Sequence, residues 1–145
     1  MKRIVVFTLL FVALATINSS CEKAPKGVLA GTVYMTKDGG SGRTQVNKNT
    51  GEIRKLDLRL SFKGDSDCIL TYVLPDGKDY SRYDGTYTVS DQTPDGVWEV
   101  EIDTNIALYK ITRLVGELSG DKKKIVAEVV TADDNLNREC VFYKQ

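Results

Sequence analysis

Residues 56–62 alternate strictly between apolar and polar side chains, in the order Leu56-Asp57-Leu58-Arg59-Leu60-Ser61-Phe62. Successive side chains of a β-strand point to opposite faces, so this period of two predicts a strand with one face in a core and the other in water. Two later segments repeat the pattern: 83–89, with Tyr83, Gly85, Tyr87 and Val89 on one face, and 98–103, with Trp98, Val100 and Ile102 on one face. The pattern predicts an all-β protein.

Clusters of Gly, Pro, Asp and Asn separate these segments, as expected for turns. They lie at 37–42, 63–67, 75–78, 92–96, 120–122 and 133–135. The first strand is expected near 28–36 and the last near 137–144, with about eight strands in all. The spacing predicts an antiparallel barrel or, as the alternative, a β-sandwich.

Two segments leave the element assignment open. Residues 106–118 carry apolar side chains that a helix could also present, but their β-branched content and Gly116 favour one or two strands. Residues 37–53 are rich in Gly, Asn and Thr, and they form either a long first loop or an extra short hairpin.

Several short motifs occur in an order that covers nearly all of 28–145. They are Leu29-Ala30-Gly31-Thr32-Val33-Tyr34, Leu60-Ser61-Phe62, Tyr83-Asp84-Gly85-Thr86-Tyr87-Thr88-Val89, Leu118-Ser119-Gly120-Asp121-Lys122 and Cys140-Val141-Phe142-Tyr143-Lys144. In order and spacing they resemble the small lipocalin-like domains of bacterial lipoproteins, although Val33 stands where that family usually has Trp. The resemblance implies an eight-stranded up-and-down antiparallel barrel and no common enzymatic activity.

The amino-terminal segment has the layout of a secretory signal. Lys2 and Arg3 precede an apolar run over 4–17, which is shorter than the roughly 20 residues that span a bilayer. Small polar residues at 18–20 then lead to Cys21, which resembles the lipobox of bacterial lipoproteins, although Asn18 stands where Leu is usual. In that family the cysteine becomes the first mature residue and carries acyl chains such as palmitate. The alternative is an ordinary secretory signal with Cys21 as a spare thiol.

This interpretation divides the chain into three parts. Residues 1–20 are the lipoprotein signal peptide, 21–27 a lipidated tether, and 28–145 the β-barrel domain. Glu22 replaces the Asp that is the family's usual signal for retention in the inner membrane. We therefore expect a lipid-anchored protein of the bacterial cell envelope, at the outer membrane.

The composition excludes several kinds of chemistry. The chain has no His, which removes Ser-His-Asp and Cys-His catalysis and His-containing zinc sites. Loss of Lys2 and Arg3 leaves 18 basic and 20 acidic residues, so no strong charge favours nucleic acid. Asp65, Asp67 and Asp76 cluster in turns, where Asp bonds its own backbone more often than it binds calcium. We expect no enzyme, metal or cofactor.

The two remaining cysteines, Cys68 and Cys140, have two interpretations. In an exported protein they often form a disulfide. Alternatively, both are small buried residues of core strands. The sequence does not decide between the two.

Two sets of residues are candidate binding groups. Phe62, Tyr87 and Trp98 are predicted to point into the barrel, where they either line a ligand cavity or, more commonly, fill the core. A predicted loop before the central strand carries Lys78, Tyr80, Arg82 and Tyr83, and exposed Tyr and Arg are residues that interfaces favour.

Three functions are therefore considered. The first is a non-catalytic binding module for a small apolar ligand or a protein partner. The second is a hydrolase inhibitor that presents the loop 75–83. The third is a glycosidase that uses two carboxylates, which needs an acid pair about 5–10 Å apart in one cleft.

Mass spectrometry of the mature protein tests the anchor. We expect a chain that begins at Cys21 and carries acyl chains on that residue, because several chains at about 0.8 kcal/mol per buried methylene hold a protein firmly in a bilayer. A mature chain cut elsewhere, with an unmodified Cys21 thiol, would contradict the lipoprotein assignment.

Overall fold

The computed structural model describes residues 27–104, 111–131 and 138–145. Nine β-strands account for most of them: β1 Val33–Met35, β2 Arg43–Val46, β3 Ile53–Lys63, β4 Asp67–Val73, β5 Asp79–Gln92, β6 Trp98–Asp103, β7 Ile111–Leu118, β8 Lys124–Thr131 and β9 Arg138–Lys144. All neighbouring strands are antiparallel. The expectation of an all-β fold is confirmed.

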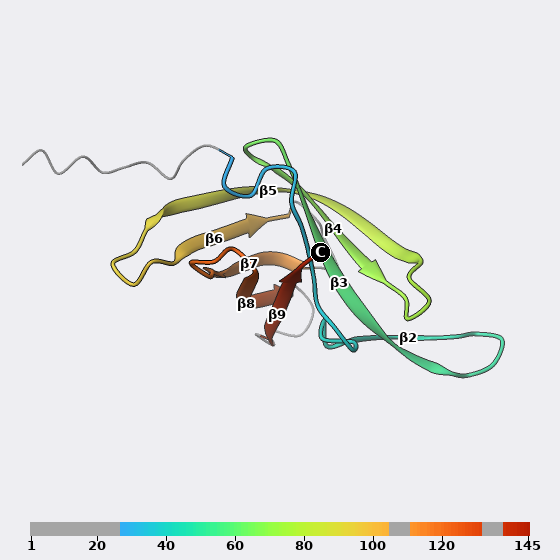
Figure 1. Ribbon diagram of the computed structural model, residues 1–145. Helices are drawn as coiled ribbons and strands as arrows, with labels where there is room; N and C mark the ends of the chain where they lie inside the picture. Colours follow the sequence, from blue (N-terminus) through green and yellow to red (C-terminus); the bar gives the residue numbers. More distant parts are fainter. Residues whose placement is uncertain (1–26, 105–110, 132–137) are drawn as a thin grey trace, which may run out of the picture.

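The sheet closes on itself through β1. Strands β3 to β9 follow one another in chain order, and β1 pairs with β9 on one side and with β3 on the other (Figure 1). The result is a closed eight-stranded up-and-down barrel with β2 as an extra strand. The barrel prediction is therefore confirmed, and the alternative of a β-sandwich is wrong.

Strand β3 is longer than its neighbour β1 and pairs with two strands along the same edge. Its carboxy-terminal half pairs with β1, and its first four residues pair with β2. Strands β1 and β2 therefore lie one after the other along the same edge of β3, interrupted by residues 36–42. This arrangement settles the segment 37–53 as a loop followed by an extra hairpin, and it shortens the expected strand 28–36 to three residues.

The interior of the barrel is filled by the side chains that alternate inward. Leu56, Leu58, Leu60 and Phe62 of β3 are all buried, as are Trp98, Val100 and Ile102 of β6. The Phe62 ring lies edge-on to two tyrosines, with centroids 6.0 Å from Tyr34 and 4.8 Å from Tyr87. Where β7 and β8 meet, a β-carbon on Gly116 would lie 2.4 Å from that of Ala127, so the strands leave no room for a larger residue there.

The two ends of the barrel differ. One end, called here the closed end, is sealed by the turns 63–67 and 119–123, where Tyr87 and Tyr34 donate hydrogen bonds to the carbonyls of Gly64 and Lys122, each at 2.7 Å. The buried Leu29, just before β1, adds to this seal. The other end carries the β2–β3 hairpin, which extends past the neighbouring strands at the lower right of Figure 1. We call it the hairpin end.

One carboxylate organises the loop between β1 and β2. Asp57 Oδ1 accepts hydrogen bonds from Thr36 Oγ1 at 2.8 Å and from the amides of Gly39 and Gly40 at 3.0 and 3.3 Å. Gly39 has a φ of 76°, and a β-carbon on it would lie 2.3 Å from the Lys55 Cβ, so this position requires glycine. The loop is thereby fixed against the middle of β3, at the base of the hairpin.

Replacing Asp57 with alanine is expected to destabilise the domain by about 1–3 kcal/mol, because three donors lose a charged acceptor. The measurement is the free energy of unfolding from urea titration. The control is Asp91→Ala, at an exposed position at the end of β5, which should stay within about 0.5 kcal/mol of the parent. Equal effects of the two substitutions would show that the loop does not depend on Asp57.

Candidate functional site

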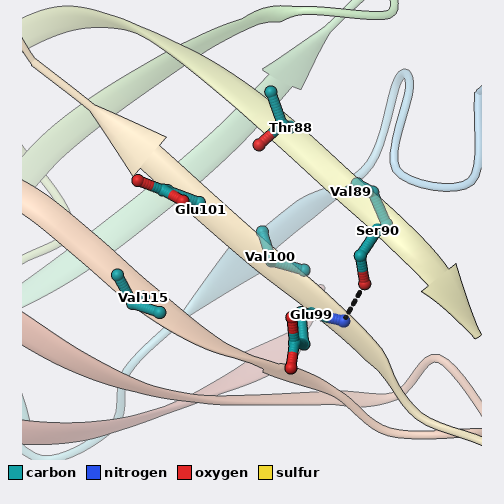
Figure 2. Close-up of a pocket in the computed structure, with 7 residues that line it drawn as sticks. All are labelled: Thr88, Val89, Ser90, Glu99, Val100, Glu101 and Val115. Atoms are coloured by element: carbon teal, nitrogen blue, oxygen red, sulfur yellow. Dashed lines mark hydrogen bonds between the residues drawn. The ribbon is translucent and has the colours of Figure 1, made fainter. Parts of the chain in front are cut away.

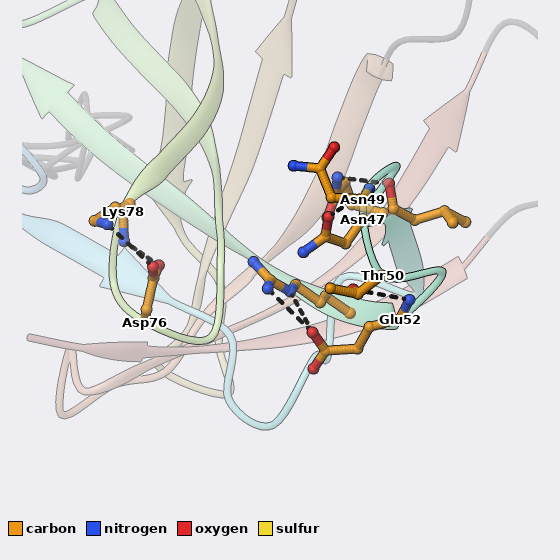
Figure 3. Close-up of polar contacts among 9 residues, drawn as sticks. Asn47, Asn49, Thr50, Glu52, Asp76 and Lys78 are labelled. Carbon is orange, nitrogen blue, oxygen red and sulfur yellow. Dashed lines mark hydrogen bonds and ion pairs between the residues drawn. The ribbon is translucent and has the colours of Figure 1, made fainter.

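The β2–β3 hairpin, residues 43–56, is the most prominent projection of the described chain. Its turn is held by hydrogen bonds from Asn47 N to Glu52 O at 2.8 Å and from Gly51 N to Asn47 O at 2.7 Å. The Asn47 side chain also accepts a bond from Asn49 N at 3.0 Å (Figure 3). These internal bonds give the tip a defined shape before any partner binds.

The outer face of the hairpin carries an exposed apolar pair. Val46 and Ile53 lie directly opposite each other across the two strands. They are 53% and 69% exposed, the two highest values among the large hydrophobic residues of the described chain. Exposed apolar side chains that lie together, rather than singly, are a feature of contact surfaces.

The hairpin is also basic. It contains Arg43, Lys48, Arg54 and Lys55 against a single acid, Glu52. Arg54 forms an ion pair with Glu52, with 3.0 Å between Nη2 and Oε2. Lys48 in the turn and Lys55 on the outer face therefore give the exposed Val46–Ile53 pair cationic neighbours.

The base of the hairpin is anchored in a polar cluster inside the hairpin end. Arg43 hydrogen-bonds the hydroxyl of the buried Tyr72, whose ring lies edge-on to Tyr83 at 6.3 Å. Arg138 Nη1 donates to the carbonyl of Gly42 at 2.6 Å. Burial raises the pKa of Tyr72 to about 12, and the Arg43 charge only partly opposes this shift.

Two side-chain oxygens in the same region are buried without a hydrogen-bond partner. They are Gln45 Oε1, on the inner side of β2, and Ser81 Oγ, opposite Tyr72 on β5. Buried polar atoms are normally paired. Of the three such atoms in the described chain, two lie at the hairpin end, and the third, Thr93 Oγ1, lies in the turn between β5 and β6.

A second surface, called here the acidic face, covers the outside of β6 to β9. Glu99 of β6 lies opposite Glu117 of β7, and Glu128 of β8 lies opposite Glu139 of β9. Like charges directly opposite each other destabilise a sheet. Within the described residues, none of these four glutamates forms an ion pair.

Shallow hollows of about 200 and 310 Å³ cover this face and its edges. The first, shown in Figure 2, is lined by Thr88, Val89, Ser90, Glu99, Val100, Glu101 and Val115. Val115 is 40% exposed and lies between Glu101 and Glu128 on the neighbouring strands. The acidic face thus combines glutamates with an exposed aliphatic side chain.

The predicted ligand-lining residues lie in the core. Phe62, Tyr87 and Trp98 are at most 7% exposed and belong to the packing of the closed end, where Lys122 Nζ sits 5.2 Å from the Trp98 ring centroid. All three belong to the hydrophobic core of the barrel. This placement favours the structural role for all three.

The prediction that Lys78, Tyr80, Arg82 and Tyr83 lie in one loop is wrong. Strand β5 begins at Asp79, so Tyr80, Arg82 and Tyr83 lie on a strand, and the turn ends at Lys78. Tyr80 and Arg82 point outward, whereas Tyr83 points inward against Tyr72, because alternate residues of a strand face opposite ways. Lys78 pairs with Asp76 at 3.5 Å. The four side chains therefore do not form one surface.

Cys68 and Cys140 are buried free thiols on β4 and β9. Cys68 lies between Phe62 and Gly85 on the adjacent strands, whereas Cys140 lies beside Ala127. Burial raises the pKa of Cys68 to about 12 and also raises that of Cys140. Of the two interpretations, the structure has the buried thiols and not the disulfide.

The acidic residues of the turns do not converge. In the described parts of the chain, no group of three or more acidic or cysteine side chains is placed to hold a metal ion. Asp79 instead pairs with Arg59 at 2.7 Å, and Asp84 lies 3.9 Å from Arg82.

Reasoning from sequence gave the hairpin as one of two alternatives for residues 37–53, but it missed the exposed apolar pair and the acidic face. Val46 and Ile53 flank a turn rich in Asn, Thr and Gly, and this would have been the signal for an extra hairpin with exposed apolar residues. The predicted signal peptide, Cys21 and most of the predicted tether lie outside the described residues. In the ranges that are described, no helix is long and apolar enough to cross a membrane.

Comparison with known proteins supplies no family. No protein-family model matches the chain, and no similar curated protein or solved structure was found.

The buried tyrosines predict a loss of stability in alkali. Folding raises the pKa of Tyr34 and Tyr72 to about 12, from about 10 in an unfolded chain. Their neutral forms favour the native state, so the stability that these two tyrosines contribute is complete below pH 10 and falls as pH rises from about 10 towards 12. A Tyr34→Phe/Tyr72→Phe variant should show a shallower decline in urea titrations over this range. The same decline in the variant and the parent would refute this cause.

Proposed function

We propose that this chain is a lipocalin-like lipoprotein of the outer membrane, anchored through Cys21. Its function in this proposal is non-catalytic binding of a protein partner through the β2–β3 hairpin. The observation that carries the proposal is the exposed Val46–Ile53 pair near the tip of a basic hairpin whose turn is held by hydrogen bonds.

Three features support a role in binding at the surface. The barrel interior is occupied by its own side chains, so the space for an apolar ligand is small around Phe62 and Tyr87. The hairpin is preorganised by turn hydrogen bonds and by Asp57 at its base, which lowers the entropy lost on binding. Apolar residues with cationic neighbours give such a contact both affinity and orientation.

Inhibition of a hydrolase is one form that this function could take. In that case the hairpin, rather than the segment 75–83, is the element that enters the enzyme's cleft. Substitution of Val46 and Ile53 should then weaken inhibition, whereas substitution of Tyr80 and Arg82 should leave the inhibition constant unchanged.

A second candidate function is the binding of a small polar ligand at the hairpin end. It is favoured by the unpaired oxygens of Gln45 and Ser81 near the guanidinium group of Arg43. A thermal denaturation screen against lipids, haem and glycans tests it. A rise in melting temperature that Ser81→Ala abolishes would favour this function over partner binding.

Site-specific photo-crosslinking in the native cell envelope tests the proposed function. A photo-crosslinking amino acid in place of Val46 or Ile53 in the full lipidated chain should yield a discrete protein adduct, because these side chains would be buried against the partner. The same group in place of Lys63, exposed at the closed end of β3, is the control and should yield none. Failure of both hairpin positions to yield a protein adduct would reject the hairpin as the binding element.

A further inference from the structure

We propose that the β2–β3 hairpin binds a second copy of this chain, and that the acidic face of that copy receives it. The inference rests on the proposed function, since it names the partner of the same hairpin. It joins the exposed Val46–Ile53 pair to a face on which Glu99, Glu117, Glu128 and Glu139 form no ion pair within the described residues.

The apolar parts of the two surfaces match. The hairpin presents Val46 and Ile53 side by side, and the acidic face presents Val115 beside a shallow hollow. These three residues are among the five large hydrophobic side chains that the described chain exposes. Contact between them removes aliphatic surface from water on both sides, which is the main source of affinity in protein association.

The charges of the two surfaces are opposite. Lys48 and Lys55 lie near the apolar pair of the hairpin, whereas Val115 lies among Glu101, Glu117 and Glu128 of β6, β7 and β8. Arg113 of β7 pairs with Glu101, and within the described residues the other two carboxylates form no ion pair. The pairs Glu99–Glu117 and Glu128–Glu139 repel within one copy. A lysine placed between two such carboxylates reduces their repulsion. Binding the hairpin of another copy therefore removes an unfavourable electrostatic interaction that is present in the isolated barrel.

The topology makes the contact intermolecular. Around the closed barrel, β3 and β7 are separated by β4, β5 and β6 on one side and by β1, β9 and β8 on the other. The hairpin therefore leaves the barrel on the side opposite the centre of the acidic face, and it cannot fold back onto its own copy. Each copy donates a hairpin and receives another, which is a head-to-tail contact that builds chains of subunits.

Cysteine crosslinking of the full lipidated protein in its own membrane tests the contact. The Ile53→Cys/Val115→Cys variant should give a ladder of dimers and larger species on non-reducing gels, because each copy carries both halves of the contact. Co-expression of the two single variants should give only the dimer. The control pair Ile53→Cys/Tyr80→Cys, which places the second thiol at an exposed site outside the acidic face, should give no ladder.

Charge reversal tests the electrostatic part in the same crosslinking background. Lys48→Glu/Lys55→Glu should reduce the crosslinked fraction several-fold, and so should Glu117→Lys/Glu128→Lys. Combining the two reversals should restore it, because opposite charges again face each other. Lys63→Glu, at the closed end of β3, is the control and should have no effect.

The outcomes separate this inference from the proposed function. Absence of an Ile53–Val115 product, or a crosslinked fraction that is indifferent to charge reversal, would overturn the second copy as the partner. If photo-crosslinking from Val46 then captured a different protein, the hairpin would remain the binding element. Disulfides between two Ile53→Cys residues would also overturn the inference, because they would indicate a symmetric hairpin-to-hairpin contact.

Discussion

The structure depends on a three-residue strand. Strand β1 is the only link of the described chain that pairs with both β3 and β9, so without it the sheet would be an open one with two long unpaired edges. Tyr34 at its centre is buried and reaches across to the Lys122 carbonyl, and Thr36 just after it is bonded to Asp57. The hydrogen bonds of Tyr34 and Thr36 therefore add to the few backbone hydrogen bonds by which β1 closes the barrel.

The same closure moves the binding surfaces to the outside. Because β1 covers only the second half of β3, the first half of β3 extends past the barrel and is paired by β2 alone. The interior, meanwhile, is occupied by Phe62, Tyr87 and their neighbours. Because the interior of the barrel is filled, the surfaces that remain for binding are the projecting β2–β3 hairpin and the outer face of the sheet.

The near-neutral composition conceals an uneven distribution of charge. Acidic and basic residues are equal in number over the whole chain, yet the hairpin is basic and the outside of β6 to β9 is acidic. Long-range steering of partners follows the local potential rather than the net charge. The separation of the charges also explains why the composition gave no indication of a partner.

The sequence by itself determined the strands and their inward faces, because alternation with a period of two records which side of a strand is buried. The alternating residues of β3 and β6 lie inside as expected, and most turns fall where Gly, Pro and Asp cluster. Only the tertiary structure decided that Cys68 and Cys140 stay apart and that Val46 and Ile53 are left exposed. Each of these depends on register and closure between distant strands, and local sequence patterns carry no information about which residues lie opposite one another across a sheet.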